Sequence, residues 1–226
     1  ELVFPVQSDA SSNSARRAVP APRGVAVAVL PCYDTSPRRL YDGNMEFFLR
    51  SPAEPSRLAV LPGAFNPPTR AHFALAQAAL GVADQVLFVL PRAFPHKHYE
   101  GASFEDRVRM LAAAAEGDPR LSIAAAPEGL FIDIARACRA AYPALARLYI
   151  VCGCDAARRA VEWDYGQPGA FARMLDEFEL LVADRQGHYE PPPELKHRIH
   201  PLPLGAGYGD ISATEVRERI RSGRDW

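Results

Sequence analysis

Residues 58–72 read Leu-Ala-Val-Leu-Pro-Gly-Ala-Phe-Asn-Pro-Pro-Thr-Arg-Ala-His, and this stretch decides the fold. It opens with a short apolar run that is typical of a buried strand. Gly63 follows the run, and a residue without a side chain lets the backbone turn sharply and lets a ligand approach closely. A helix is predicted over residues 70–80, so Thr69 and His72 lie three residues apart at its start and share one face. The stretch therefore predicts a strand, a loop and the first turn of a helix.

The start of this helix has the composition of a phosphate site. Free backbone N–H groups at a helix N-terminus attract anions, and the Thr69 hydroxyl and the His72 imidazole stand beside them. A Thr-x-x-His pair alone more often marks a capping threonine and a satisfied polar histidine. The complete string from Gly63 to His72, in which Asn66 and two prolines fix the loop, is far more specific. We therefore expect a phosphate to bind here.

Outward from this stretch, short apolar runs alternate with helical patterns. We predict strands at residues 58–61, 85–90, 121–125, 148–152, 178–183 and 199–204, and helices at residues 70–80, 103–116, 131–141, 155–162, 168–176 and 212–222. This alternation predicts an α/β fold, a Rossmann-like doubly wound parallel sheet with helices on both faces. Such sheets bind ligands beyond the carboxyl ends of their strands. The candidate sites are therefore the loops that follow residues 61, 90, 152 and 204.

The alternation begins at residue 57, so we predict one α/β domain over residues 57–226 and an N-terminal extension over residues 1–56. A chain of 226 residues with 48% hydrophobic content suits one sizeable domain. Within the extension, residues 8–23 are typical of a flexible linker and residues 24–30 of a strand. Residues 31–56 give mixed signals. An extra element laid against the domain and the remnant of a preceding domain both fit them.

The bulk composition excludes several classes of protein. The net charge is −1, from 26 basic and 27 acidic residues, so nothing indicates a nucleic acid or an anionic membrane surface as a partner. No apolar run reaches membrane-spanning length and no secretory signal is evident, so we expect a cytoplasmic protein. The sequence begins without Met, so we expect a trimmed chain or a fragment. The four cysteines form no CxxC pair, which favours reduced cysteines over a zinc site.

A second polar cluster lies near the C-terminus, where several glycines precede Asp210-Ile-Ser-Ala-Thr-Glu-Val-Arg217. The glycines lack the spacing of a dinucleotide-binding loop. Ser212 and Glu215 form the pattern of a capping box, which predicts the start of the last helix. Capping alone accounts for that pair, but it does not account for the hydroxyl of Thr214 and the guanidinium of Arg217 beside it.

Together the two clusters resemble the nucleotidylyltransferase superfamily. Residues 63–72 are similar to its signature G-x-F-N-P-x-[HT]-x-G-H, and residues 211–217 resemble its second signature, I-S-S-T-x-[IV]-R. Both occur in the expected order, and the resemblance extends over residues 57–223. Two positions depart from the pattern. Ala71 replaces the usual glycine and adds a methyl near the triphosphate path, and Ala213 replaces a serine and removes a hydroxyl.

The resemblance implies a catalytic set and an ATP site. The implied catalytic residues are His72, Thr69 and Arg217. The residues that would bind ATP and its phosphates are Gly63, Phe65, Asn66, Ser212, Thr214, Asp155 and Arg185. Asp155 matches a G-x-D loop, which would place it near the adenosine ribose. Arg185 matches a strand that ends in arginine before glycine, which would place it beside the adenine.

The region between the signatures is most like bacterial nicotinate-mononucleotide adenylyltransferases. Pro91-Arg-Ala-Phe-Pro-His-Lys97 resembles their P-P-H-K loop, which implies that His96 and Lys97 contact a substrate phosphate. Arg107 lies in their R-x-x-M pattern and fits a phosphate contact and a structural ion pair equally. Trp163 fits stacking on a pyridine ring and ordinary core packing equally.

The resemblance thus implies adenylyl transfer from ATP to nicotinate mononucleotide, with Mg²⁺ carried by the ATP phosphates rather than by a protein metal site. ATP and the mononucleotide would be its small-molecule partners. A related transferase with another acceptor, such as phosphopantetheine or a CTP-dependent alcohol phosphate, is a first alternative. A non-catalytic nucleotide-binding module is a second. The sequence also leaves open the choice between nicotinate and nicotinamide, and between a monomer and a homo-oligomer.

Overall fold

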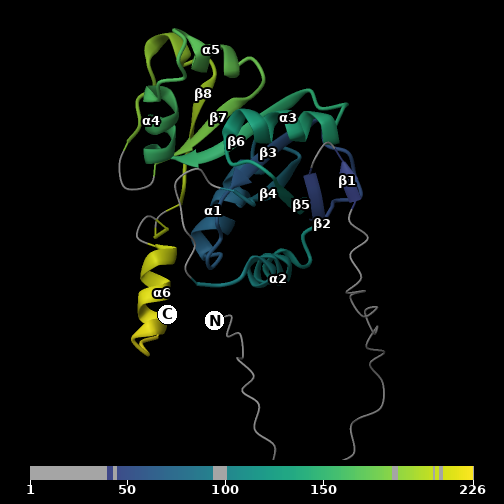
Figure 1. Cartoon of the computed structure of the whole chain (residues 1–226), viewed down its shortest axis with the longest axis vertical. Coiled ribbons are helices and arrows are strands. Elements are labelled where there is room, and N and C mark those ends of the chain that lie inside the picture. The colour runs from purple at the N-terminus through teal and green to yellow at the C-terminus, as the bar shows by residue number, and fades with distance from the viewer. Residues whose placement is uncertain are drawn as a thin grey trace, which may run out of the picture. The chain divides into compact units, whose positions relative to one another are not determined.

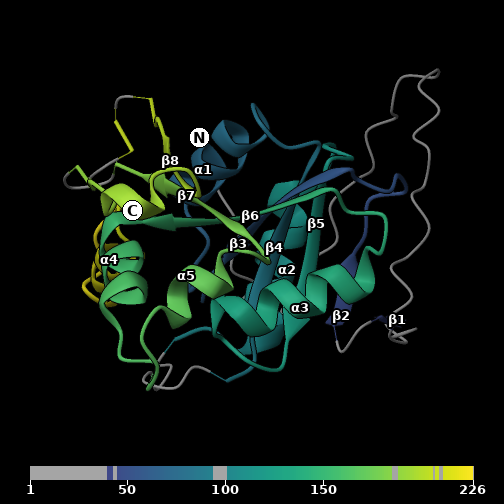
Figure 2. The same cartoon turned by 90° about the horizontal axis from the view of Figure 1, so that it is seen from above.

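The computed structural model describes residues 40–42, 45–93, 101–184, 188–205, 207–208 and 211–225. These residues all belong to one compact unit, Arg38–Trp226. A single twisted sheet runs through this unit, and helices lie on both of its faces (Figure 1). The same three layers are visible from above (Figure 2).

The sheet has eight strands in the order β1-β2-β5-β4-β3-β6-β7-β8. Their bounds are β1 (Leu40–Asp42), β2 (Met45–Leu49), β3 (Arg57–Pro62), β4 (Gln85–Pro91), β5 (Leu121–Ala126), β6 (Arg147–Gly153), β7 (Glu179–Ala183) and β8 (Ile199–Leu202). The six strands from β3 to β8 are parallel, whereas β2 pairs with β5 in the antiparallel direction. Numbered from β3, the parallel strands have the order 3-2-1-4-5-6 of a doubly wound sheet. The predicted α/β fold is therefore confirmed.

The helices divide between the two faces of the sheet. They are α1 (Arg70–Ala79), α2 (Phe104–Ala115), α3 (Phe131–Ala141), α4 (Cys154–Glu162), α5 (Ala170–Met174) and α6 (Ala213–Arg221), with a 3-10 turn at Pro193–Leu195. One core contains residues of α1 and α2, and the other contains residues of α3, α4 and α5. Successive residues of β3 alternate between these cores, because side chains of a strand point to opposite faces. Burial on both faces explains why the strands are apolar runs without polar alternation.

Two strands precede residue 57, where the sequence placed the start of the domain. β2 lies beside β5 and buries Met45 and Phe47 in the core that α3 covers. Part of the stretch 31–56 is therefore an extra element of the sheet, which was one of its two interpretations. The predicted linker at 8–23 and the predicted strand at 24–30 lie outside the described residues.

The helix predicted at residues 168–176 is shorter than expected. Gly169 has a φ of 69°, so it caps α5 in the left-handed conformation and the helix begins at Ala170, after Pro168. In the described part of the chain no helix is long and apolar enough to cross a membrane. Cys138 and Cys152 are buried thiols, and burial raises the pKa of each to about 12. They stay protonated at neutral pH, which disfavours both metal binding and nucleophilic chemistry.

Candidate functional site

The site lies at the carboxyl ends of β3 and β6, where the strand order reverses. The chain winds from β3 toward β5 on one side and from β6 toward β8 on the other. Val60 pairs with Ile150, so Gly63 and Gly153 follow at adjoining strand ends. A doubly wound sheet opens a crevice at this point, because the two halves of the chain leave it in opposite directions.

The loop after β3 is packed around the ring of Phe65. This residue has a φ of 48°, and its ring is buried against Phe88 at 5.5 Å and against His72 at 5.1 Å between centroids. At the start of the loop, the Gly63 N–H donates to the Val89 carbonyl at 3.0 Å. The buried Phe65 ring thus packs against the imidazole of His72 and limits its movement.

Gly63 has no room for a side chain, so we expect Gly63→Ala to destabilise the protein by about 1–3 kcal/mol through overpacking. A Cβ at this position would lie 2.9 Å from Cζ of the Phe65 ring, which cannot move without displacing Phe88. Thermal unfolding measures the effect. Gly153→Ala is the matched control, because nothing lies within 4 Å of its Cβ and its φ is −87°. We expect the control to change stability by less than about 1 kcal/mol, and equal losses in both variants would contradict the packing argument.

Thr69 and His72 form a reciprocal cap at the start of α1. The Thr69 N–H donates to Nδ1 of His72 at 2.9 Å, and the Thr69 hydroxyl lies 2.8 Å from the same nitrogen. A nitrogen that accepts an N–H carries no proton, so the proton of the neutral ring is on Nε2. The cap therefore fixes both the orientation and the tautomer of the imidazole. The N–H donor of the neutral ring is then Nε2–H.

The two positions that depart from the family pattern differ in burial. Ala71 is buried, so the methyl that it adds packs inside the protein. Ala213 is the first residue of α6 and is partly exposed. The N-cap of this helix is formed by Ser212, whose Oγ accepts the Thr214 N–H at 3.2 Å.

Arg217 of α6 joins the C-terminal cluster to the loop after β3. Its Nη1 donates to the carbonyl of Asn66 through a short hydrogen bond, and its Nη2 donates to Oγ1 of Thr214 at 3.2 Å. The carboxamide of Asn66 in turn accepts the Ala102 N–H at 3.1 Å. Residues 66 and 217 are thus in direct contact although 151 residues separate them. The structure brings the two polar clusters together at one edge of the sheet.

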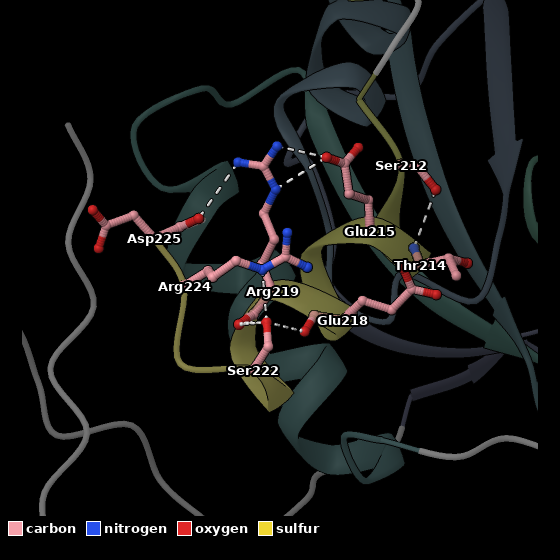
Figure 3. Close-up of polar contacts among 8 residues, drawn as sticks. All are labelled: Ser212, Thr214, Glu215, Glu218, Arg219, Ser222, Arg224 and Asp225. Atoms are coloured by element: carbon pink, nitrogen blue, oxygen red, sulfur yellow. Dashed lines mark hydrogen bonds and ion pairs between the residues drawn. The ribbon is translucent and has the colours of Figure 1, made fainter.

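The remaining polar contacts of α6 run along the helix (Figure 3). Glu215 pairs with Arg219 at 2.6 Å, one turn further on. The sequence predicted that Glu215 would complete a capping box with Ser212. The structure has the Ser212 cap, but the Glu215 carboxylate faces the guanidinium of Arg219 because that charge is within reach. Ser222 ends the helix by donating to the Glu218 carbonyl at 2.8 Å.

Arg107 of α2 contacts the backbone of the loop after β3. It is buried, and its guanidinium donates to the Ala64 carbonyl at 2.8 Å and to the Ser103 carbonyl at 3.3 Å. The sequence left a phosphate contact and a structural ion pair open for Arg107. In the structure its partners include two backbone carbonyls, so this residue helps to shape the loop after β3. The motif could not indicate this role, because every residue carries a carbonyl and none leaves a signal in the sequence.

Asp155 and Trp163 lie at the two ends of α4. Asp155 is exposed in its first turn, beside the carboxyl end of β6. Trp163 follows its last turn and is 55% exposed, which does not fit core packing. The indole lines an open cavity of about 620 Å³, together with Tyr165 and Gln167. His96, Lys97 and Arg185, also predicted for the site, lie outside the described residues.

The site contains three kinds of hydrogen-bond donor that can bind an anion: backbone and imidazole N–H groups, hydroxyls and a guanidinium. Among the residues that the structure describes, no group of three or more His, Cys, Asp or Glu side chains could hold a metal ion. The donors come from two helix N-termini, one imidazole and one arginine. This set suits phosphate groups, which accept hydrogen bonds and carry negative charge.

Comparison with known proteins identifies the family of this chain and several of its relatives. A family model described as cytidylyltransferase-like matches residues 60–219. Three bacterial relatives carry the name "Probable nicotinate-nucleotide adenylyltransferase". The protein from Gloeobacter violaceus is 33% identical over 182 residues and the one from Solibacter usitatus is 32% identical over 176 residues. The protein from Thermus thermophilus is 30% identical over 175 residues. The alignments cover 74% of this chain and 85%, 88% and 88% of those proteins, respectively.

Solved structures share the fold at lower sequence identity. One is the Plasmodium falciparum nicotinic acid mononucleotide adenylyltransferase complexed with NaAD, with a TM-score of 0.56 and 17% identity. Another is the same enzyme complexed with APC, with a TM-score of 0.56 and 16% identity. Each match covers 74% of this chain and 85% of the other.

Proposed function

Because the chain belongs to the cytidylyltransferase-like family of nucleotidylyltransferases, we propose that it transfers the adenylyl group of ATP to nicotinate mononucleotide. A phosphate oxygen of the mononucleotide attacks the α-phosphorus of ATP. The bond from that phosphorus to the oxygen that bridges to the β-phosphorus breaks, and pyrophosphate leaves with the electron pair. The product is the dinucleotide that nicotinate-nucleotide adenylyltransferases form. The names of the bacterial relatives support this acceptor.

Such a reaction requires alignment and charge stabilisation rather than a protein nucleophile, since the acceptor phosphate is already nucleophilic. In this proposal His72 Nε2–H and the Thr69 hydroxyl donate to the α-phosphate as its negative charge grows. The N-terminus of α6, with Ser212, Thr214 and Arg217, holds the departing pyrophosphate. No step needs a residue to give up or accept a proton.

The contact of Arg217 with Asn66 is the observation that carries the proposal. It joins the end of α6 to the loop that holds His72, so a single triphosphate can touch both donor groups. If these clusters lay on separate surfaces, neither would serve phosphoryl transfer. Gly63 and Phe65 support the same proposal by shaping the loop, because the glycine leaves space and the ring fixes the imidazole.

Mg²⁺ enters this proposal with ATP. In this proposal the ion is held by phosphate oxygens and water. The ion would neutralise part of the triphosphate charge. Asp155 would accept from the ribose hydroxyls of ATP, and Arg185 would lie beside the adenine. His96 and Lys97 would contact the acceptor phosphate, and Trp163 would stack on the pyridine ring.

The proposal is tested by pyrophosphate release with ATP, Mg²⁺ and nicotinate mononucleotide, with chromatography of the dinucleotide product. We expect equal amounts of pyrophosphate and dinucleotide. Parallel reactions replace ATP with CTP, or the acceptor with nicotinamide mononucleotide or phosphopantetheine. Turnover only with CTP or phosphopantetheine would identify a related transferase instead. ATP binding by calorimetry without pyrophosphate release from any pair would identify a nucleotide-binding module.

A further inference from the structure

The backbone of Arg92 is fixed at the carboxyl end of β4. Its N–H donates to the Ala126 carbonyl at 2.8 Å, and the next N–H, of Ala93, donates to the Pro127 carbonyl at 3.2 Å. The ladder between β4 and β5 thus continues past both strands. Arg92 lies beyond the last strand residue, Pro91, on the same edge of the sheet as Gly63.

The guanidinium of Arg92 is held at two places. Its Cζ lies 4.4 Å over the ring of Phe104, and its Nη2 donates to the Glu46 carboxylate through a short contact. The Glu46 side chain is 7% exposed, whereas that of Arg92 is 46% exposed. The guanidinium is therefore anchored to a buried carboxylate, while nearly half of the Arg92 side chain is exposed. A guanidinium has five N–H donors in a fixed plane, so it can hold Glu46 and bind a second anion.

Phe104 connects Arg92 to the loop after β3. The guanidinium of Arg107 lies 5.5 Å from the same ring, and it donates to the Ala64 carbonyl in that loop. Arg92 is thus three contacts away from Ala64, which lies in the loop that precedes His72. It lies on the side of β4 and β5, whereas Arg217 reaches the loop from the C-terminal helix.

We propose that Arg92 binds an anionic group of the acceptor mononucleotide and that Glu46 is the positioning residue that orients it. The inference rests on the proposed function, in which two anionic substrates must meet at one phosphorus. Their repulsion is strong at short distance, so a cation on the acceptor side lowers the energy of the encounter. The group recognised is a carboxylate or a phosphate, because a planar guanidinium binds both.

The burial of Glu46 supports this role over a merely structural ion pair. Replacement of a buried ion pair by apolar residues is often neutral or stabilising, so packing alone gives no reason for a carboxylate inside β2. The strand already buries Met45 and Phe47 on either side of Glu46. A carboxylate here instead fixes the direction of Arg92. Glu46 lies in β2, before residue 60, where the match to the family model begins.

Steady-state kinetics of Arg92→Met test the proposal, with Arg120→Met as the matched control. Arg120 pairs with Asp118 at 2.7 Å and its side chain is 53% exposed, but it lies at the amino end of β5. We expect Arg92→Met to raise the KM of the acceptor about 10- to 100-fold, the effect of losing a charge-assisted hydrogen bond. The KM of ATP should change little, and the control should leave both values unchanged.

The two acceptors distinguish the anionic groups. A rise in KM for nicotinate mononucleotide alone assigns the pyridine carboxylate to Arg92, and a rise for the nicotinamide form as well assigns the phosphate. An unchanged KM for both, or a rise for ATP instead, overturns the proposal. If the wild-type chain releases no pyrophosphate, the proposed function fails by itself. Calorimetric titration with nicotinate mononucleotide then decides, because equal affinity in wild type and Arg92→Met, or no binding by either, overturns the role of Arg92.

Glu46→Met tests the positioning role. Arg92→Met removes the counter-charge that Arg92 provides to the buried Glu46 carboxylate, which can destabilise the fold. If the Arg92→Met protein does not fold, the double variant Glu46→Met/Arg92→Met is used in its place. We expect Glu46→Met alone to raise the acceptor KM less than Arg92→Met does. In the double variant Glu46→Met should add nothing further, because its effect acts through Arg92. Additive effects would show that Glu46 does not act through Arg92.

Discussion

Replacement of His72 by alanine is expected to lower kcat by at least about 10²-fold, because the loss of one preorganised donor to the developing negative charge has this effect. The structure makes His72 a donor through Nε2, since its Nδ1 accepts the Thr69 N–H. The variant should remain folded, with a stability loss of about 0.5–2 kcal/mol from the missing helix cap. Pyrophosphate release and thermal unfolding measure the two effects separately.

Two further substitutions at residue 72 separate capping from catalysis. In His72→Asn the amide oxygen takes the place of Nδ1 and can accept the Thr69 N–H, but no donor reaches the place of Nε2. We expect this variant to unfold near the wild-type temperature and to be as slow as the alanine variant. His72→Gln carries an amide N–H at about the reach of Nε2, so it should recover part of the rate. Turnover near the wild-type value in His72→Asn would show that the imidazole serves only as a cap.

The regular part of this fold is predictable because each element satisfies a local rule. α3 has the bounds predicted from residues 131–141, and β4 extends the predicted strand 85–90 by one residue. Both segments have an apolar pattern that matches a buried face, so sequence and tertiary packing favour the same structure. The exception among the predicted helices, α5, begins late because Gly169 adopts a left-handed conformation that its sequence neighbours do not reveal.

β2 was not predictable for a different reason. Its partner is β5, and Glu46 pairs in register with Ala125 far along the chain. A charged residue in a five-residue apolar segment weakens the strand signal, because its counter-charge on Arg92 is visible only in three dimensions. The antiparallel pairing also departs from the βαβ rhythm that identified the other strands.

The sequence predicts which residues form the candidate site, but it does not predict their contacts. The two motifs identify Thr69, His72 and Arg217, yet sequence spacing does not give the hydrogen bond from Arg217 to the Asn66 carbonyl. Likewise, the motif around Arg107 does not show that its partner is the Ala64 carbonyl. Both contacts involve backbone acceptors, which are the same in every residue. The roles of the catalytic and substrate-binding residues stay predictions, and the variants described above test them.

Arg217→Lys is expected to lower kcat by about 10²- to 10³-fold and to raise the KM of ATP, although the positive charge is kept. The Arg217 guanidinium makes two hydrogen bonds at the same time: Nη1 donates to the Asn66 carbonyl and Nη2 donates to the Thr214 hydroxyl. A lysine ammonium is a single point on a flexible stem, so it cannot hold α6 to the loop and also face a phosphate. We therefore expect both the alignment of the pyrophosphate and its stabilisation to be lost. Initial rates over a range of ATP concentrations measure this.

The control for Arg217 lies on the same helix. Arg219→Lys changes an arginine that pairs with Glu215 on the exposed side of α6, and exposed pairs contribute about 0–1 kcal/mol. Because the pair lies along the helix and not across to the loop, we expect wild-type kinetics (Figure 3). Equal losses of kcat in the two variants would mean that α6 depends on each of its arginines for stability, whether or not the arginine contacts the loop. A loss confined to Arg217→Lys, with an unchanged unfolding temperature, would instead assign the effect to the bridge between helix and loop, since Arg217 contacts the Asn66 carbonyl in the loop whereas Arg219 contacts Glu215 and Asp225.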